Sequence, residues 1–79
     1  MELKVEPIAE NFRFTLTASR LDIKDENKAK PFFVLIGFAR ATGLPFNFKQ
    51  ENEQITLTVD EMSSDQASVM QDVMKQVML

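Results

Sequence analysis

The chain has neither cysteine nor histidine among its 79 residues. Disulfide bonds are therefore impossible, and the common zinc sites built on Cys and His side chains are excluded. Nucleophilic catalysis by a Ser-His or Cys-His pair is excluded for the same reason. The two glycines, Gly37 and Gly43, are too few for the glycine-rich loops that bind phosphate groups.

Long hydrophobic runs are also missing. The longest apolar stretch, residues 32–39, is far shorter than the roughly 20 residues needed to span a bilayer. The first ten residues alternate charged and apolar types and lack the basic start and apolar run of a signal peptide. Together with the missing cysteines, which fit a reducing compartment, these features predict a soluble cytoplasmic protein without membrane association.

Acidic residues gather in two groups, and both groups lie where helices are predicted to begin. They are Asp22, Asp25 and Glu26 in the first group and Asp60, Glu61 and Asp65 in the second. Neither group has the spacing of a calcium-binding loop. Acids near the start of a helix interact favourably with its dipole, so we assign both groups to helix starts. The sequence therefore predicts no enzymatic activity, no cofactor and no metal site.

The chain does contain enough apolar material for one small domain spanning residues 1–79. Apolar residues make up 44% of the sequence and charged residues 27%, which are ordinary proportions for a globular domain. A domain of this size buries about 60% of the surface of its unfolded chain, so its stability is marginal. Good packing or a partner subunit has to supply the missing stability.

Alternating apolar and polar residues predict two β-hairpins. The first strand contains Pro7, which lacks a backbone N–H and therefore favours an edge position. The second strand starts at Phe12, and a bulge at Ser19 and Arg20 would let it continue to Ile23. The second hairpin covers residues 46–59, and its turn at residues 50–53 has no glycine, so we do not expect a tight two-residue turn.

Two further segments predict helices. The first covers residues 28–42, where Asn27 can cap the start and Gly43 marks the end. It is apolar nearly all round, so we expect it to be the buried helix. The second begins after Ser63, which has capping-box spacing to Gln66. The order is ββαββα, which predicts an α+β fold with a four-stranded, mainly antiparallel sheet and both helices packed on one face.

The last predicted helix carries two neighbouring apolar rows. They are Val69, Val73 and Val77 in one row and Met70, Met74 and Met78 in the other. At about 100° per residue the two rows span an arc of about 180°, wider than the roughly 100° of a helix that lies on a core. We expect the valine row to pack on the sheet and the methionine row to face the first helix or another molecule. The alternative is that both rows pack within the chain.

A strip of small side chains lies on the first predicted helix, where Gly37 and Ala41 are one turn apart. A glycine inside a helix costs up to about 1 kcal/mol relative to alanine, which indicates a packing reason. We expect the second helix of the same chain to occupy this strip, with a symmetry-related copy as the alternative.

The net charge of −3 conceals an asymmetry along the chain. Residues 13–49 contain seven bases and three acids, a net of +4, whereas residues 50–79 contain six acids and one base, a net of −5. The simplest interpretation is that the two regions neutralise each other on the surface of one fold.

The basic residues also suggest a second surface, on the polar side of the predicted sheet. Its members are Lys4, Arg13, Thr15, Thr17 and Lys49, a mildly basic set that could contact phosphate groups. However, all four strand phenylalanines are in phase with the core, and sheets that read single strands stack bases on aromatic side chains. The pI of about 4.8 is also far from the basic footprint of nucleic-acid-binding proteins.

By elimination, the sequence favours a non-catalytic protein–protein interaction module, with a second copy of itself in a homodimer as the favoured partner. The predicted binding residues are Met70, Met74, Met78 and Leu79, with Gly37 and Ala41 as a docking strip. The alternative is a nucleic-acid-associated regulatory protein that uses the polar sheet face.

Overall fold

The computed structural model describes residues 1–78, which form four strands and three helices. The predicted α+β class and the ββαββα order are confirmed, with one short additional helix before the long one. The elements are β1 (Glu2–Ile8), β2 (Asn11–Ser19), α1 (Arg20–Lys24), α2 (Glu26–Thr42), β3 (Phe46–Glu51), β4 (Gln54–Met62) and α3 (Ser64–Val77).

The strands form one open antiparallel sheet in the order β1-β2-β4-β3. This order makes β1 an edge strand, as Pro7 predicted, and β3 the opposite edge. Leu3 of β1 lies beside Leu16 of β2, which lies beside Leu57 of β4. Because side chains alternate along a strand, this register turns one apolar face of the sheet toward the helices.

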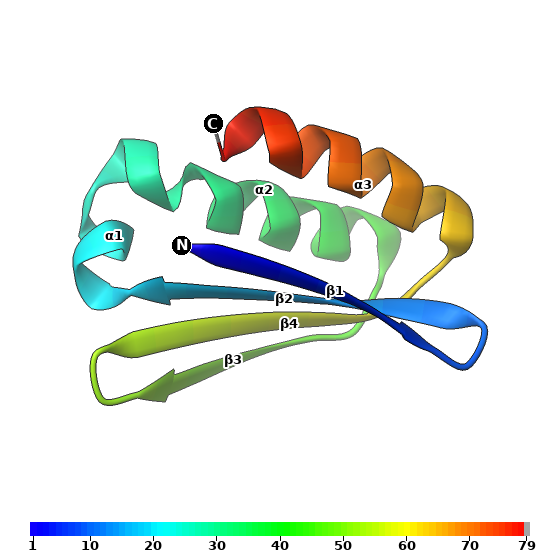
Figure 1. The fold of residues 1–79 in the computed structure, drawn as a ribbon, viewed down its shortest axis with the longest axis horizontal. Coiled ribbons are helices and arrows are strands. Elements are labelled where there is room, and N and C mark those ends of the chain that lie inside the picture. The colour runs from blue at the N-terminus through cyan, green and yellow to red at the C-terminus, as the bar shows by residue number, and fades with distance from the viewer. Residues whose placement is uncertain (79) are drawn as a thin grey trace.

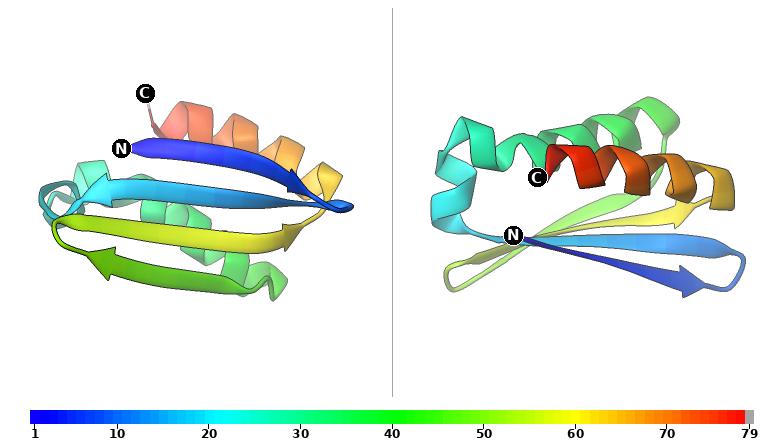
Figure 2. Two further views of the ribbon diagram at one scale, coloured as in Figure 1. Left: turned by 60° about the horizontal axis from the view of Figure 1, so that its bottom comes forward. Right: turned by 45° about the horizontal axis from the view of Figure 1, so that its top comes forward.

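Both long helices lie on that apolar face and run in opposite directions (Figure 1). Helix α3 follows the β1–β2 side of the sheet, whereas α2 crosses behind the strands diagonally and reaches β3 near its start (Figure 2, left). The second half of β3 is therefore left without a helix over it in the described part of the chain (Figure 2). None of the helices in residues 1–78 is both long and apolar enough to cross a bilayer.

The segment after β2 differs from the sequence prediction. Residues 20–24 form α1 instead of continuing the strand, because the side chain of Ser19 accepts a hydrogen bond from the N–H of Asp22 (3.2 Å) and caps a helix. The irregularity in the β2–β4 pairing lies at Arg13, which is opposite two residues of β4, Asp60 and Glu61, and Glu61 has a positive φ of 62°. The predicted bulge at Ser19 and Arg20 is therefore wrong.

The ends of α2 follow the capping rules, with one shift in position. Asp25 caps its start by accepting a hydrogen bond from the N–H of Asn27 (3.0 Å), so the predicted cap at Asn27 is wrong by two residues. Gly43 ends the helix in the left-handed conformation (φ 72°), and Leu44 donates its N–H to the carbonyl of Ala39 (2.9 Å). The predicted end of this helix is confirmed.

The turn between β3 and β4 is tighter than the sequence suggested. Glu51 pairs with Gln54, which leaves Asn52 and Glu53 as a two-residue turn. Asn52 takes the positive φ (54°) that such a turn requires. Asparagine tolerates this conformation, so the missing glycine does not prevent a tight turn.

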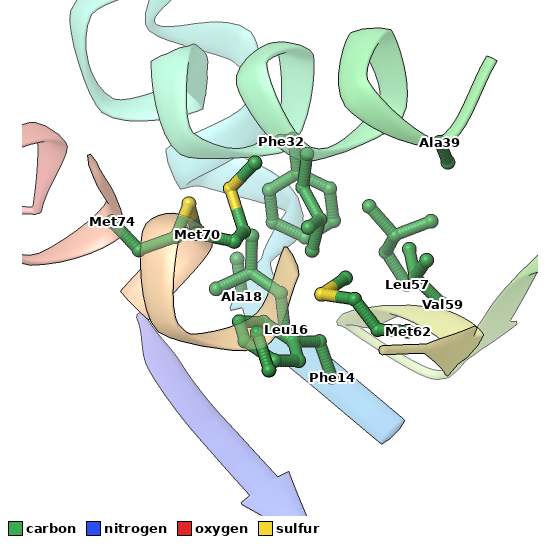
Figure 3. Packing of buried hydrophobic residues seen from close by; sticks show 12 residues of the cluster. Phe14, Leu16, Ala18, Phe32, Ala39, Leu57, Val59, Met62, Met70 and Met74 are labelled. Carbon is green, nitrogen blue, oxygen red and sulfur yellow. The ribbon is translucent and has the colours of Figure 1, made fainter. Parts of the chain in front are cut away.

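The rotation of α3 buries the methionine row more deeply than the valine row, contrary to the expectation that the valines are the row packed on the sheet. Met70 and Met74 are buried in the core (Figure 3), whereas Val69 is 58% exposed. The capping box of Ser63 and Gln66 is formed, and Met62 and Ala67 are buried on either side of it. Met62 and Ala67 thus occupy the two positions of a hydrophobic staple. Met70 and Met74 face the core, and Val73 is partly buried against the same core.

We expect Met74→Ala to lower the free energy of unfolding by about 2–5 kcal/mol, because it leaves a cavity in the core. Val69→Ala, at an exposed position on the same helix, should change that free energy by no more than about 0.5 kcal/mol. Urea denaturation followed by circular dichroism measures both values. Equal losses for the two variants would contradict the observed rotation of α3.

Candidate functional site

The methionine row does not form a surface on the folded subunit. Met70 is 3% exposed and Met74 is fully buried, while Met78 is partly buried against the same core. Leu79, the fourth residue predicted with them, lies outside the described residues. The interpretation that the methionines pack within the chain therefore holds for Met70 and Met74, and they are unavailable to a partner in this structure.

The strip of Gly37 and Ala41 is exposed rather than filled by the second helix. A Cβ placed on Gly37 would meet no atom within 4 Å beyond the adjoining backbone of its own helix, and Ala41 is exposed as well. The expected occupant, α3, does contact α2 on the apolar face of the sheet, but it leaves Gly37 and Ala41 exposed. The expectation that α3 fills the strip is therefore wrong.

An exposed aromatic side chain continues this strip toward the start of α2. Phe33 precedes Gly37 by four residues, as Gly37 precedes Ala41, so the three lie along one side of the helix. Phe33 is 64% exposed, although its neighbour Phe32 is almost completely buried. The expectation that this is the buried helix holds for one side of α2 only, because a two-layer fold covers a helix on one side and leaves its outer side in solvent.

A groove of about 320 Å³ separates α2 from the second half of β3, and Phe33 lies on its wall. It forms where the diagonal course of α2 leaves β3 uncovered (Figure 2). Phe48 of β3 also lines it and remains 48% exposed. The lining residues are Ile23, Ala29, Phe32, Phe33, Ile36, Phe48, Lys49, Gln50 and Ile55. The volume lies at the lower limit of ligand-binding clefts, and most of the lining is apolar.

Aromatic contacts hold the β3 side of the groove in place. The ring of Phe48 stacks on that of Phe32, with centroids 6.4 Å apart and planes 8° apart. Phe46 meets Phe48 edge to face at 6.4 Å, and the guanidinium of Arg40 lies 5.8 Å from the centroid of Phe46. Offset stacks and edge-to-face pairs are favourable arrangements of aromatic rings. The exposed half of Phe48 is thus presented in a fixed orientation.

The outer edge of β3 adds backbone hydrogen-bonding groups to this apolar surface. The N–H of Asp60 donates to the carbonyl of Pro45 (2.9 Å). Hydrogen bonding alternates along an antiparallel pair, so the odd-numbered residues of β3 bond to β4. The even-numbered residues then turn their N–H and C=O groups away from the sheet. They are Phe46, Phe48 and Gln50.

We name this region the α2–β3 surface and define it as Phe33, Ile36, Phe48 and the outer edge of β3. The sequence analysis missed it, although the signal was present. Residues 28–42 are apolar nearly all round, and a two-layer fold can bury only one side of such a helix. The excess apolar width was assigned to the last helix, which buries its methionines, instead of to α2, which exposes Phe33.

The polar sheet face gathers the residues predicted for nucleic acid, but it is not basic. The register places Lys4, Arg13, Thr15, Thr17 and Lys49 on the side opposite the helices, together with Glu2, Glu6, Glu51 and Asp60. Each of the three bases pairs with an acid: Lys4 with Glu6 (3.7 Å), Arg13 with Asp60 and Lys49 with Glu51 (2.9 Å). The face therefore carries three bases and four acids, and the expectation that it is mildly basic is wrong.

The ion pair at the centre of this face is its best-defined polar contact. Arg13 donates a hydrogen bond to Asp60, and this bond together with the charge of Asp60 raises the pKa of Arg13. The guanidinium therefore stays charged and engaged with its own chain. Four threonines follow it along the same two strands in two cross-strand pairs, Thr15 with Thr58 and Thr17 with Thr56.

The prediction that both acidic groups lie at helix starts is wrong for Asp60 and Glu61, which lie in β4, where Asp60 pairs with Arg13. The other members of the two groups do lie at helix starts. Asp25 is the cap of α2, and Asp65 lies in the first turn of α3. Among residues 1–78, no three acidic side chains lie close enough together to hold a metal ion. A second hollow of about 470 Å³ lies between the starts of α1 and α2 and the end of α3, lined in part by Asp22 and Lys28. It lacks the exposed aromatic side chains of the α2–β3 surface.

We expect Phe33→Ala to leave the free energy of unfolding within about 0.5 kcal/mol of the wild type, since Phe33 is largely exposed. Phe32→Ala, one residue earlier on the buried side of α2, should lower it by about 3–5 kcal/mol. Chemical denaturation of both variants tests the assignment of these two neighbours. A large loss for Phe33→Ala would make that residue structural and remove it from the candidate surface.

The charge balance of the polar sheet face predicts no salt-dependent binding of nucleic acid. We expect no binding of duplex or single-stranded DNA or RNA at low ionic strength, measured by fluorescence anisotropy. The result that would restore the nucleic-acid hypothesis is an affinity that falls steeply with salt. If such binding were found, the double variant Arg13→Ala with Lys49→Ala should bind nucleic acid more weakly than the wild type.

Comparison of the chain with protein-family models, with curated proteins and with solved structures found no match, so the assignment of function depends on the geometry of the chain itself.

Proposed function

We propose that the protein is a non-catalytic interaction module that binds another protein chain through the α2–β3 surface. The observation that carries the proposal is a pair of exposed phenylalanines, Phe33 at 64% and Phe48 at 48%, on the two sides of an apolar groove. Exposed aromatic side chains that gather at one place mark sites of interaction more often than isolated apolar residues do.

The neighbouring strand edge favours a protein over a small molecule as the bound partner. An extended segment of another chain can pair with the outward N–H and C=O groups of Phe46, Phe48 and Gln50. Side chains of that segment on the helix side of the sheet would enter the groove beside Phe33. Backbone pairing then supplies affinity, and the apolar groove supplies specificity. A small apolar ligand would use the groove and leave the strand edge unpaired.

The polar groups around the groove support a binding role rather than a chemical one. Lys49 and Gln50 are the polar residues that line it, and the ammonium group of Lys49 pairs with Glu51 at 2.9 Å. A general acid or base has to lie within hydrogen-bonding reach of a reacting group and needs a pKa suited to proton transfer. Stacked rings and a strand edge meet neither requirement, whereas both are common in protein interfaces.

Site-specific photo-cross-linking in the cells that produce the protein tests this proposal. A photoreactive phenylalanine analogue is placed at position 33, and in a matched control at position 69 on α3, because Val69 is a similarly exposed apolar residue. We expect a discrete protein adduct from position 33 and none from position 69. The partner, identified by mass spectrometry and purified, should bind Phe33→Glu at least about tenfold more weakly than the wild type.

The control decides between a specific surface and general adhesiveness. Adducts of equal yield from both positions would mean that any exposed apolar side chain is captured, which contradicts a defined α2–β3 surface. The absence of any adduct from position 33 would contradict the proposal itself.

A further inference from the structure

We infer that the protein chain bound by the α2–β3 surface is a second copy of this chain, an inference that rests on the function proposed above. The two copies pair β3 with β3 in antiparallel orientation about a two-fold axis at Phe48, and the two sheets become one sheet of eight strands. Closed pairing of one patch with itself is the commonest symmetry among protein oligomers.

The two edges of the sheet differ in their suitability for such pairing. In β1, Pro7 lacks an N–H, and Glu2, Lys4 and Glu6 place a charge at every second position. Proline and charged residues are common means by which edge strands avoid pairing with other chains. The β3 strand contains no proline, and its outward-bonding residues are Phe46, Phe48 and Gln50. Lys49 and Glu51 also place charges on β3, but without a proline every outward N–H of this edge can pair. The β3 edge therefore lacks the protection that Pro7 gives β1.

The bonding pattern of β3 selects one register for the pair. An axis at Phe48 places Phe48 opposite the partner's Phe48 and Phe46 opposite the partner's Gln50. All three outward-bonding residues of each copy then take part, and residues opposite each other at such positions exchange both N–H and C=O bonds. An axis one residue away, at Asn47 or Lys49, engages two outward residues of each copy instead of three.

The avoidance of like-charge contacts disfavours one of the alternative registers. An axis at Lys49 would place two lysines directly opposite each other, which is destabilising. With the axis at Phe48, Lys49 lies opposite the partner's Asn47, and like charges do not face each other directly. Phe48 lies opposite its own copy on the helix side of the sheet, where cross-strand aromatic pairs contribute favourably.

The shape of each subunit fits this arrangement. Helix α2 crosses diagonally, so the first half of β3 is covered by a helix and the second half is not (Figure 2). Antiparallel pairing places the uncovered half of one copy beside the covered half of the other. The partner's Phe46 then lies opposite Gln50, at the groove. The exposed faces of Phe33 and Phe48 would be removed from water by this contact.

The first experiment measures the mass in solution. Light scattering on the purified chain should give twice the chain mass of 9.0 kDa at high concentration. Phe33→Glu should raise the dissociation constant of the dimer by about tenfold or more, because it places a charge in the apolar contact. The matched control, Val69→Glu, replaces a similarly exposed apolar residue of α3 and should leave the dissociation constant unchanged.

A second variant tests the strand pairing separately from the apolar contact. Gln50→Pro removes an N–H that points away from β4, so it should prevent pairing between copies while the sheet of each copy stays intact. We expect a folded monomer by circular dichroism and light scattering. A dimer as stable as the wild type would contradict β3–β3 pairing.

Cysteine pairing tests the register, since the natural chain contains no cysteine. In the Phe48-centred register, position 47 of one copy lies directly opposite position 49 of the other, within the range for a disulfide. An oxidised mixture of Asn47→Cys and Lys49→Cys should therefore give a covalent dimer faster than either variant alone. Faster pairing within Lys49→Cys alone would overturn this register.

The outcomes separate this inference from the function on which it rests. A wild-type monomer at the highest accessible concentration would overturn the second copy as partner. The proposed interaction function would still stand if position 33 cross-links to a different protein. A dimer that is insensitive to Phe33→Glu and Gln50→Pro would place the contact elsewhere and overturn both the register and the surface.

Discussion

Two helices have to cover the apolar face of a four-stranded sheet, and the way in which they share that face determines which side chains remain exposed. Helix α3 starts with a capping box, and Met62 just before it and Ala67 in its first turns are buried. The helix turns Met70 and Met74 into the core. Methionine is flexible and polarizable, so it fills the irregular space between two helices and a twisted sheet well.

The diagonal course of α2 completes the core at the expense of one corner of the sheet. Phe32, Leu35 and Ala39 are buried beneath the helix, and Phe48 stacks on Phe32 at the margin of the core. Beyond that stack the helix no longer lies above β3 (Figure 2). Phe33 and Phe48 are exposed there because no further helix or strand covers them. The same corner contains the edge of β3. An apolar groove beside unpaired backbone groups is well suited to another chain.

The polar face of the sheet shows how the fold balances charge. The basic middle of the chain and its acidic end meet in the ion pairs of Arg13 with Asp60 and Lys49 with Glu51. The interpretation that the two regions neutralise each other is supported by these pairs. They leave a sheet face of threonines and paired charges. Interaction through the helix side and the β3 edge is therefore the alternative that this charge balance favours.

Sequence alone determined the features that depend on neighbouring residues. Alternation of apolar and polar residues located the hairpins, Gly43 ended α2, and Ser63 with Gln66 began α3, because caps and strand periodicity are set within a few residues. Prediction from neighbouring residues failed where the same short segment can form two different structures. Ser19 capped a short helix instead of allowing a bulge, and Asn52 supplied the positive φ of a tight turn without glycine.

Tertiary structure alone decided which apolar row faces inward and where the surface lies. The valine and methionine rows of α3 are equally apolar in sequence, and only the packing of the helix shows that Met70 and Met74 lie in the core. The exposure of Phe33 and Phe48 depends on the angle at which α2 crosses the sheet. That angle results from packing between segments far apart in the chain, which a local pattern of residues does not encode.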